Sequence, residues 1–423
     1  MLSTILSAFT VAEIRKKLLF TAALLALYRL GSHLPVPGIS TQAVNDIQKN
    51  FQGQGILNFL NLFSGGGLSR IAVFALGIMP YITASIILQL LTVVVPSLEK
   101  LSKEGEVGQA RITQYTRYLT VGLALAQSVG YVFLFKSFSS QVGQQVIVNF
   151  NFAKLFLIVV SLTAGCVLLM WMGELITQRG IGNGISLMIF ASIVSRLPHG
   201  VQAWWTNPDA VFKVMMPIIV FAVVAAVVFI QEGQRRIPIQ YAKRVIGRRM
   251  SQGGQTYLPL RVNMAGVIPV IFAASLMAFP PTVGQLVHTH WATSVSNFFS
   301  PNKWPYVVGE SILIILFTYF YTAVTFNPVD QADNLKKYGG FIPGVRPGRP
   351  TAEFLDRILA RLTFPGALYL AAVAALPTVL INQTSANFFF GGTSLLIVVG
   401  VALDTMKQLE AQLMMRNYEG FLK

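Results

Sequence analysis

Residues 55–96 read GILNFLNLFSGGGLSRIAVFALGIMPYITASIILQLLTVVVP, a short apolar stretch joined to a long one by a glycine-rich hinge. As a helix, Leu57 to Phe63 would rise only about 10 Å, whereas the hydrocarbon core of a membrane is roughly 30 Å thick. Ile71 to Val95 is long enough to span that core. A non-spanning segment at membrane depth survives only where protein or water surrounds it. The stretch therefore predicts a segment folded back into a cavity, and hence a channel or a transporter.

The composition is that of a membrane protein with several spans. Of the 423 residues, 54% are hydrophobic and only 11% are charged, and the mean hydropathy is +0.61. The net charge of +16 comes from basic residues scattered between apolar runs, so it indicates topology rather than nucleic-acid binding. The single cysteine, Cys166, excludes an intramolecular disulfide, and we expect it to be a small buried side chain. No small-residue cleavage site follows the first apolar run, which we expect to be retained as a span.

Hydropathy predicts ten spans in addition to the half-helix. They run over about Leu18–Leu34, Ile71–Val95, Gln114–Lys136, Phe152–Leu175, Ile181–Leu197, Val211–Ile230, Asn263–Val287, Val307–Phe326, Leu362–Ile381 and Thr393–Met414. With the N-terminus inside, 24 Lys and Arg residues face the cytoplasm and seven face outward. This asymmetry predicts that both termini are cytoplasmic. Ten spans divide into two sets of five, which allows an inverted repeat, although no self-similarity is visible.

Two of the predicted cytoplasmic loops are long, Gln231–Arg261 and Asn327–Arg361. The first mixes basic residues with β-formers around Ser251–Gly254, which predicts a hairpin. In the second, Pro343–Gly348 forms a stiff, basic tip. Both are consistent with ordinary positive-inside loops, and equally with docking surfaces for a cytoplasmic partner that carries negative charge.

Several other chemistries have little support in the sequence. The four histidines lack the spacing of a zinc pair, so no metal is expected: His33, His199, His288 and His290. The GIGNG sequence at 180–184 follows an apolar run rather than a strand, which favours a tight turn over a phosphate loop. Glu174, Glu310 and Asp404 lie toward the ends of spans, whereas a coupled transporter needs a carboxylate near the midplane.

Two spans carry isoleucines four residues apart. These are Ile78, Ile82 and Ile86 in the second span, and Ile185 and Ile189 in the fifth. A polar stripe runs beside the first set on the same helix, formed by Ser85, Gln89 and Thr92. By itself this spacing is weak evidence, because isoleucines on membrane helices usually contact lipid or neighbouring helices.

Six motifs are distributed along the chain: SGGGLSR at 64–70, FALGIMPYITASIILQLLTVVVP at 74–96, RGIGNGIS at 179–186, VNMAGVIP at 262–269, ADNLKK at 332–337 and FGGTSLLIVV at 390–399. Taken together, they resemble the bacterial SecY family, the channel subunits of the general protein translocase. The resemblance covers essentially the whole chain, in order.

The resemblance implies an all-α membrane protein with two pseudo-symmetric five-helix halves, residues 1–200 and 201–423, around an hourglass pore. The half-helix and its hinge would plug the outer funnel: Ile56, Leu57, Asn58, Phe59, Leu60, Asn61, Leu62, Phe63, Ser64, Gly65, Gly66 and Gly67. The constriction would be a ring of apolar side chains: Ile78, Ile82, Ile185, Ile189, Ile271 and Ile397. Such a ring excludes water when empty and makes no specific bond to a passing polypeptide.

The resemblance also implies a lateral gate between spans 2 and 3 and spans 7 and 8. Our candidates for contacts that hold it shut are Ser85, Gln89, Thr92 and Asn263. The expected partners are the membrane subunits SecE and SecG, the motor ATPase SecA and the ribosome. Arg248, Arg249 and Arg346 would dock the last two, and Arg349 departs from the family by making the tip more basic. We expect a passive pore in the bacterial plasma membrane, with neither enzymatic activity nor a cofactor. The alternatives were a solute transporter and an intramembrane enzyme.

Overall fold

The computed structural model describes residues 9, 11–40, 42–44, 46, 61, 63–142, 145–148, 150–206, 210–241, 245–246, 249–250, 255–286, 294–295, 298–299, 303–384 and 392–421. The chain forms two compact units. Unit 1 comprises Met1–Pro208, Ala274–Tyr306 and Val401–Lys423, and unit 2 comprises Asp209–Ala273 and Val307–Gly400. The predicted division into residues 1–200 and 201–423 stays a prediction.

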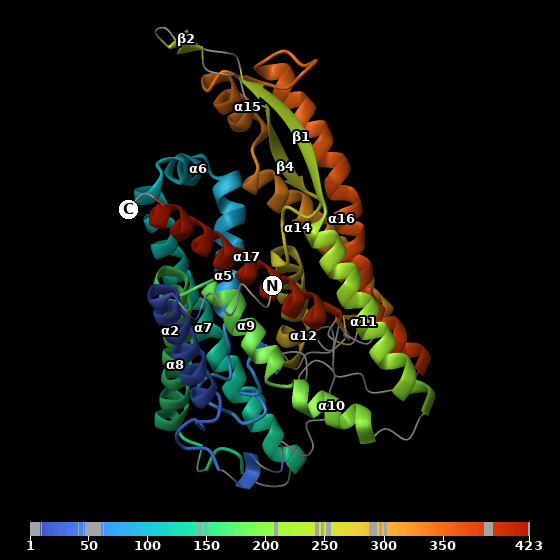
Figure 1. Ribbon diagram of the computed structural model, residues 1–423. Coiled ribbons are helices and arrows are strands. Elements are labelled where there is room, and N and C mark those ends of the chain that lie inside the picture. Colours follow the sequence, from blue (N-terminus) through green and yellow to red (C-terminus); the bar gives the residue numbers. More distant parts are fainter. Residues whose placement is uncertain are drawn as a thin grey trace. The chain divides into compact units, whose positions relative to one another are not determined.

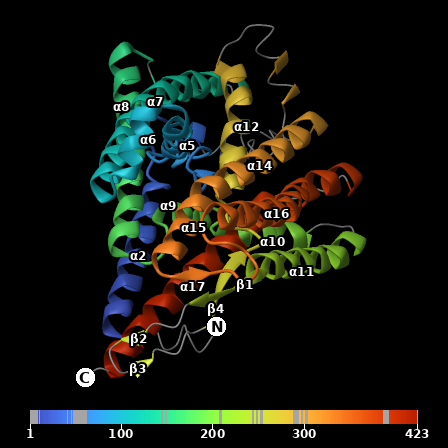
Figure 2. The ribbon, with the colours of Figure 1, turned by 90° about the horizontal axis from the view of Figure 1, so that it is seen from above.

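Unit 1 is helical. It contains α2 (Ala12–Gly31), α5 (Met79–Val94), α6 (Pro96–Lys103), α7 (Glu106–Val142), α8 (Phe152–Arg179), α9 (Gly184–Val194) and α10 (Leu197–Thr206). The later parts of α12 (Ile268–Leu286) and α17 (Gly392–Phe421) also belong to it. Helices α5, α7 and α8 pack side by side, and α2 runs along α8 (Figure 2). The predicted turn at 180–184 is confirmed, because α8 ends at Arg179 and the Asn183 side chain caps α9.

Unit 2 combines helices with a small sheet. Its helices are α11 (Ala210–Glu232), most of α14 (Trp304–Thr325), α15 (Pro328–Lys337), α16 (Arg349–Thr384) and the first parts of α12 and α17. Its strands are β1 (Gln234–Tyr241), β2 (Val245–Ile246), β3 (Arg249–Met250), β4 (Gln255–Arg261) and β5 (Gly340–Phe341). The predicted hairpin is confirmed, since β1 pairs antiparallel with β4 from Gln234–Arg261 to Gln240–Gln255 (Figure 1).

The second predicted loop, Asn327–Arg361, is largely helical. It contains α15 and the first turns of α16, and its place as a cytoplasmic loop between spans stays a prediction. Strand β5 lies between those helices and adds to the other edge of β1, giving the order β4-β1-β5. Beneath the sheet lies a buried apolar cluster formed by Ile237, Leu260, Phe326, Ile342, Leu355, Ile358 and Leu359. The two long loops therefore share one sheet and one core.

Five helices in the described part of the chain are long and apolar enough to cross a membrane: Glu106–Lys136, Phe152–Arg179, Lys213–Glu232, Trp304–Lys337 and Arg349–Leu376. The bent pair α5 and α6, which meet at 100°, would make a sixth, and Gly184–Val194 and Ile268–Met277 are shorter apolar helices. The expectation of several membrane helices is confirmed, whereas the number ten stays a prediction.

The second predicted span begins later than expected. Residues 64–77 form turns with one bridge residue, and the helix starts only at Met79, so the start at Ile71 is wrong. The reason is backbone conformation: Ile71 has φ 48° and Gly77 has φ 60°, both incompatible with a right-handed helix. Of the predicted half-helix, Asn61 and Phe63 are described and helical, while residues 56–60 and Leu62 lie outside the described residues.

Candidate functional site

The glycine-rich hinge begins a buried turn segment in unit 1, residues 64–77. The Asn61 side chain accepts a hydrogen bond from the Ser69 amide at 3.1 Å, and the Ser64 hydroxyl accepts one from the Leu68 amide at 3.1 Å. Gly65 and Gly66 have φ of 62° and 89°, which L-residues with side chains rarely adopt. Local hydrogen bonds and glycine geometry thus replace the helix that hydropathy alone would favour.

Helix α2 holds this turn segment in place. The guanidinium of Arg29 donates to the Gly65 carbonyl at 2.6 Å, and the Tyr28 hydroxyl lies 2.5 Å from that of Ser192. A Cβ on Gly65 would come within 2.7 Å of the Tyr28 hydroxyl oxygen. The Phe74 ring stacks on Tyr28 with centroids 6.1 Å apart. The hinge is therefore fixed by side chains from α2 and α9.

Two arginines, Arg29 and Arg70, and the imidazole of His33 lie beside the hinge. His33 contacts the carbonyl of Arg29 through Nδ1 at 2.8 Å, and Arg70 approaches His33 Nε2 at 2.7 Å. This pattern fits a neutral imidazole that donates from Nδ1 and accepts at Nε2. Burial, and then the charge of Arg29, lower the pKa of the Arg70 guanidinium. Sequence reasoning missed this group, although Arg29 within an apolar run was a visible signal.

Two of the predicted pore residues of unit 1 converge on one point of α8. A Cβ built on Gly173 would lie 3.3 Å from Ile185 Cγ1 and 3.7 Å from Ile78 Cδ1. Ile78, Ile82 and Ile189 are almost fully buried, while Ile185 is half-buried. The structure thus brings together isoleucines from the start of α5 and the start of α9, which are more than 100 residues apart in the chain.

The remaining two pore candidates belong to unit 2. Ile271 lies in the first turn of α12 and Ile397 lies near the start of α17, and both are buried. Phe272, next to Ile271, packs edge-on against Phe317 of α14 with centroids 6.0 Å apart. The complete six-residue ring stays a prediction.

The predicted polar stripe on α5 is confirmed as a local feature. Gln89 Nε2 lies 3.5 Å from Ser85 Oγ, and the Thr92 hydroxyl donates to the Gln89 carbonyl at 2.7 Å. Asn263, in unit 2, is buried and donates to the Gly266 carbonyl at 2.9 Å, while its Oδ1 has no hydrogen-bond partner. A gate contact between Asn263 and the stripe stays a prediction.

A contact that sequence reasoning missed joins α5 to α12 within unit 1. The hydroxyl of Ser275 lies 3.8 Å from the sulfur of Met79, and both side chains are buried. Neither residue belongs to the polar stripe, and a methionine at the start of an apolar helix gives no sequence signal for such a pairing. This contact links the second and seventh predicted spans.

One intramembrane carboxylate has a firm partner. Arg117 of α7 makes a bidentate pair with Glu174 of α8, with Nε–Oε1 at 3.0 Å and Nη2–Oε2 at 2.6 Å. The Glu174 side chain is 11% exposed and that of Arg117 is 39% exposed, so the pair is partly desolvated. Glu174 therefore forms a structural ion pair with Arg117 that joins α8 to α7. By contrast, Glu310 of α14 is buried and its Oε1 has no hydrogen-bond partner.

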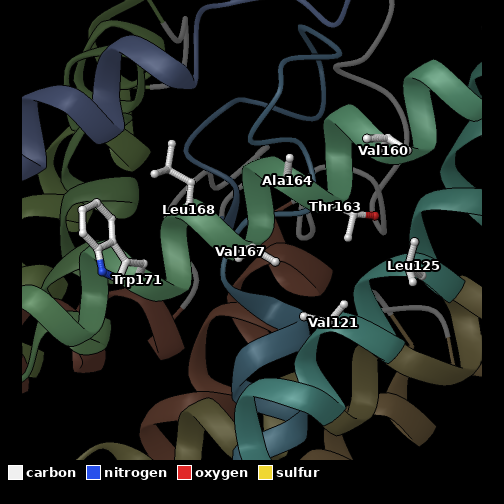
Figure 3. A pocket seen from close by; sticks show the side chains of 8 residues that line it. All are labelled: Val121, Leu125, Val160, Thr163, Ala164, Val167, Leu168 and Trp171. Carbon is white, nitrogen blue, oxygen red and sulfur yellow. The ribbon is translucent and has the colours of Figure 1, made fainter. Parts of the chain in front are cut away.

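An open apolar groove of about 590 Å³ lies between α7 and α8 (Figure 3). It is lined by Val121, Leu125, Val160, Thr163, Ala164, Val167, Leu168 and Trp171. The one hydroxyl in this lining, on Thr163, already bonds the Val159 carbonyl at 2.8 Å and lies 3.1 Å from the Ser128 hydroxyl. Leu168 and Trp171 are largely exposed. The groove has the character of a lipid-facing surface and lacks the polar ligands of a solute site.

The two docking candidates that the structure describes, Arg249 and Arg346, belong to unit 2. Arg346 is exposed, and its carbonyl accepts a hydrogen bond from the Thr351 hydroxyl at 2.8 Å, which stiffens the tip. Arg249 lies in β3, whereas Arg248 lies outside the described residues. Because β5 pairs with β1, the segments that carry these arginines belong to one folded substructure.

These features define a helical membrane protein with a buried, glycine-hinged turn segment beside converging isoleucines. A model of the SecY family matches residues 72–406. The chain is 49% identical to the protein translocase subunit SecY of Streptomyces galbus and 48% identical to that of Corynebacterium glutamicum, in each case over 100% of both chains. The chain therefore belongs to the SecY family, a family of translocation channels rather than enzymes.

Solved structures agree with this fold. One described as a protein-conducting channel matches with a TM-score of 0.65 at 20% identity, covering 93% of this chain and 91% of the other. A second, Sec61 in a canine ribosome–channel complex, matches with a TM-score of 0.61 at 19% identity, with the same coverage. A third comes from work on the plug domain of SecY and has a TM-score of 0.60 at 20% identity.

Proposed function

We infer that this chain is the channel subunit of a bacterial protein translocase. Unfolded polypeptides cross the plasma membrane through it, and apolar segments leave it sideways into lipid. The observation that carries this conclusion is the relationship over the entire length to translocase subunits at 49% identity. The protein supplies a path rather than chemistry, so the driving force comes from a partner.

The pore is sealed, in our proposal, by Ile78, Ile82, Ile185, Ile189, Ile271 and Ile397. The convergence of Ile78 and Ile185 on α8 supports this assignment. A ring of branched apolar side chains dewets when empty, which blocks ions, yet it makes no specific bond to a passing chain. A channel that must accept many sequences requires such indifference.

The plug is the segment from Ile56 to Gly67, and its hinge is the glycine run that α2 holds. The charge-assisted bond from Arg29 to the Gly65 carbonyl supports a retained, closed position. Displacement of the plug would require this bond to break, while the glycines permit the backbone to swing.

The lateral gate lies between α5 and α7 on one side and α12 and α14 on the other. The contact between Ser275 and Met79 supports a closed gate, because it joins α12 to α5. Ser85, Gln89, Thr92 and Asn263 remain our candidates for polar gate contacts. Such hydrogen bonds contribute on average about 0.6 kcal/mol each, so the gate would respond to modest changes in signal hydrophobicity.

Cytoplasmic partners dock on the substructure that contains the three-stranded sheet, with Arg248, Arg249 and Arg346 as contacts. Its exposed basic tip supports a partner with negative charge, such as the RNA of a ribosome or an acidic surface of SecA. SecE and SecG complete the complex. Both chain termini lie in the cytoplasm, as the excess of Lys and Arg in the cytoplasmic loops indicates.

Cross-linking tests the pore directly. A secretory chain is stalled in membranes that contain single cysteines at Ile78, Ile185, Ile271 or Ile397, with Cys166 replaced. A cysteine at Leu125, in the lipid-facing groove, is the matched control. We expect cross-links to the stalled chain at the four pore positions and none at the control. Absence of cross-links at all four would refute the pore.

A further inference from the structure

Gly173 of α8 lies beside two of the four proposed pore isoleucines of unit 1, Ile78 and Ile185. A Cβ at this position would be 3.3 Å from Ile185 Cγ1, 3.5 Å from Met188 Sδ and 3.7 Å from Ile78 Cδ1. The first distance is tighter than ordinary van der Waals contact, so even a methyl group would push Ile185 aside. The absence of a side chain therefore allows residues from α5 and α9 to share one site on α8.

A hydroxyl bridge fixes α9 at the same place. Thr177 donates to the Gly173 carbonyl at 3.0 Å and accepts a hydrogen bond from the Gly184 amide at 2.9 Å. A Cβ on Gly184 would overlap the Gly173 carbonyl oxygen. The first turn of α9, which carries Ile185, is thus placed by backbone contact and by one shared hydroxyl.

The rotation of α8 about its axis is fixed by Glu174, the residue after Gly173. Glu174 is clamped by the bidentate bonds from Arg117 of α7, so α8 cannot turn without breaking a partly buried ion pair. Tyr81 of α5 lies within electrostatic range of both charges. Gly173 is therefore presented to α5 and α9 in one orientation.

We propose that Gly173 is a positioning residue for the pore, and that the empty space at its Cα sets how tightly Ile78 and Ile185 pack in the seal. Thr177 has the same role through its bridge to α9. The proposal rests on the assignment of these isoleucines to the pore. It adds that the tightness of the seal is controlled from α8, by residues that never touch the translocating chain.

The test uses the full translocase in lipid bilayers and measures resting ion conductance per complex. We expect Gly173→Ala to raise the conductance about tenfold, which corresponds to about 1.4 kcal/mol, within the usual cost of overpacking. Gly122→Ala in α7 is the control, since no atom of the described residues lies within 4 Å of a Cβ there. Thr177→Val should raise the conductance as well, and Thr177→Ser should restore it because it keeps the hydroxyl.

Coupling separates this role from a general loss of stability. Combined with Ile185→Ala, which removes the crowded Cγ1, Gly173→Ala should raise the conductance by less than the product of the single effects, whereas Gly122→Ala should combine multiplicatively. Equal conductance of the Gly173→Ala and Gly122→Ala channels would overturn the proposal. The proposed pore is judged separately, because cysteines at Ile78 and Ile185 report contact with the stalled chain whatever Gly173 does.

Discussion

The hinge glycine Gly65 offers a sharp test of how the plug is held. In Gly65→Ala, the new residue must adopt φ near 62°, and its Cβ would lie 2.7 Å from the Tyr28 hydroxyl oxygen. That oxygen cannot simply move away, because it lies 2.5 Å from the Ser192 hydroxyl and the Tyr28 ring stacks on Phe74. The substitution therefore combines backbone strain with the loss of a hydrogen bond.

The magnitude follows from these two effects. A left-handed conformation costs an L-residue with a side chain about 1–2 kcal/mol, and a buried hydrogen bond contributes about 1 kcal/mol. Together they weaken the closed hinge by about 2–3 kcal/mol, which is a shift of about 30- to 150-fold toward the displaced plug. Gly66→Ala separates the two effects, because its φ is 89° but, among the described residues, the nearest atom to its Cβ is Arg70 Nη1 at 3.6 Å.

The assay is the resting ion conductance of purified complexes in planar bilayers, normalised to the amount of channel. We expect Gly65→Ala to leak more than Gly66→Ala by about fivefold, the share of the lost hydrogen bond. In a Tyr28→Phe background, Gly65→Ala and Gly66→Ala should show similar resting leaks, since the hydroxyl that the new methyl group at position 65 would contact is absent. Equal leaks from Gly65→Ala and Gly66→Ala in the presence of Tyr28 would refute the view that this side chain holds the hinge.

Three further outcomes follow from the contacts. Arg29→Gln removes the charged donor to the Gly65 carbonyl, so the resting ion leak should rise about tenfold. The leak of Arg29→Lys should lie between those of the unmodified channel and of Arg29→Gln. Arg117→Leu leaves Glu174 without its ion-pair partner and should lower the unfolding free energy by about 2 kcal/mol, reduced from the buried-pair value by exposure; an unchanged thermal midpoint would contradict it. Gly340→Val would crowd the β1–β5 pairing and should weaken ribosome binding, measured by co-sedimentation, whereas Gly122→Ala in α7, outside this sheet, should not.

The sequence predicted the elements whose signals are local. Alternating β-formers around a glycine-rich turn indicated the β1–β4 hairpin, and the apolar run from Phe152 indicated α8. Helix α15 was missed although its signal is also local, because Asn327 caps it and Pro328 opens it.

The turn segment at residues 64–77 could not have been predicted in the same way. Hydropathy predicts that a helix starts at Ile71, whereas local turn geometry and contacts with residues distant in the chain prevent it. The Val36 amide bonds the Ile71 carbonyl at 3.0 Å, and the Val73 amide bonds the Leu34 carbonyl at 2.9 Å. These bonds to the segment after α2 replace helical hydrogen bonds. A hydropathy average over the same residues shows only one continuous apolar stretch.

Helix α8 contacts the turns that follow the proposed plug and the proposed ring at separate places. A Cβ on Gly165 would overlap the Val73 carbonyl oxygen, whereas Gly173 faces Ile78 and Ile185. These two glycines are eight residues apart, about 12 Å along a helix. The two contacts are therefore separable, so we expect the proposed plug and the isoleucines to act as distinct seals. Deletion of residues 56–67 should raise resting leak yet leave translocation possible, and a channel that neither leaks nor translocates would contradict this separation.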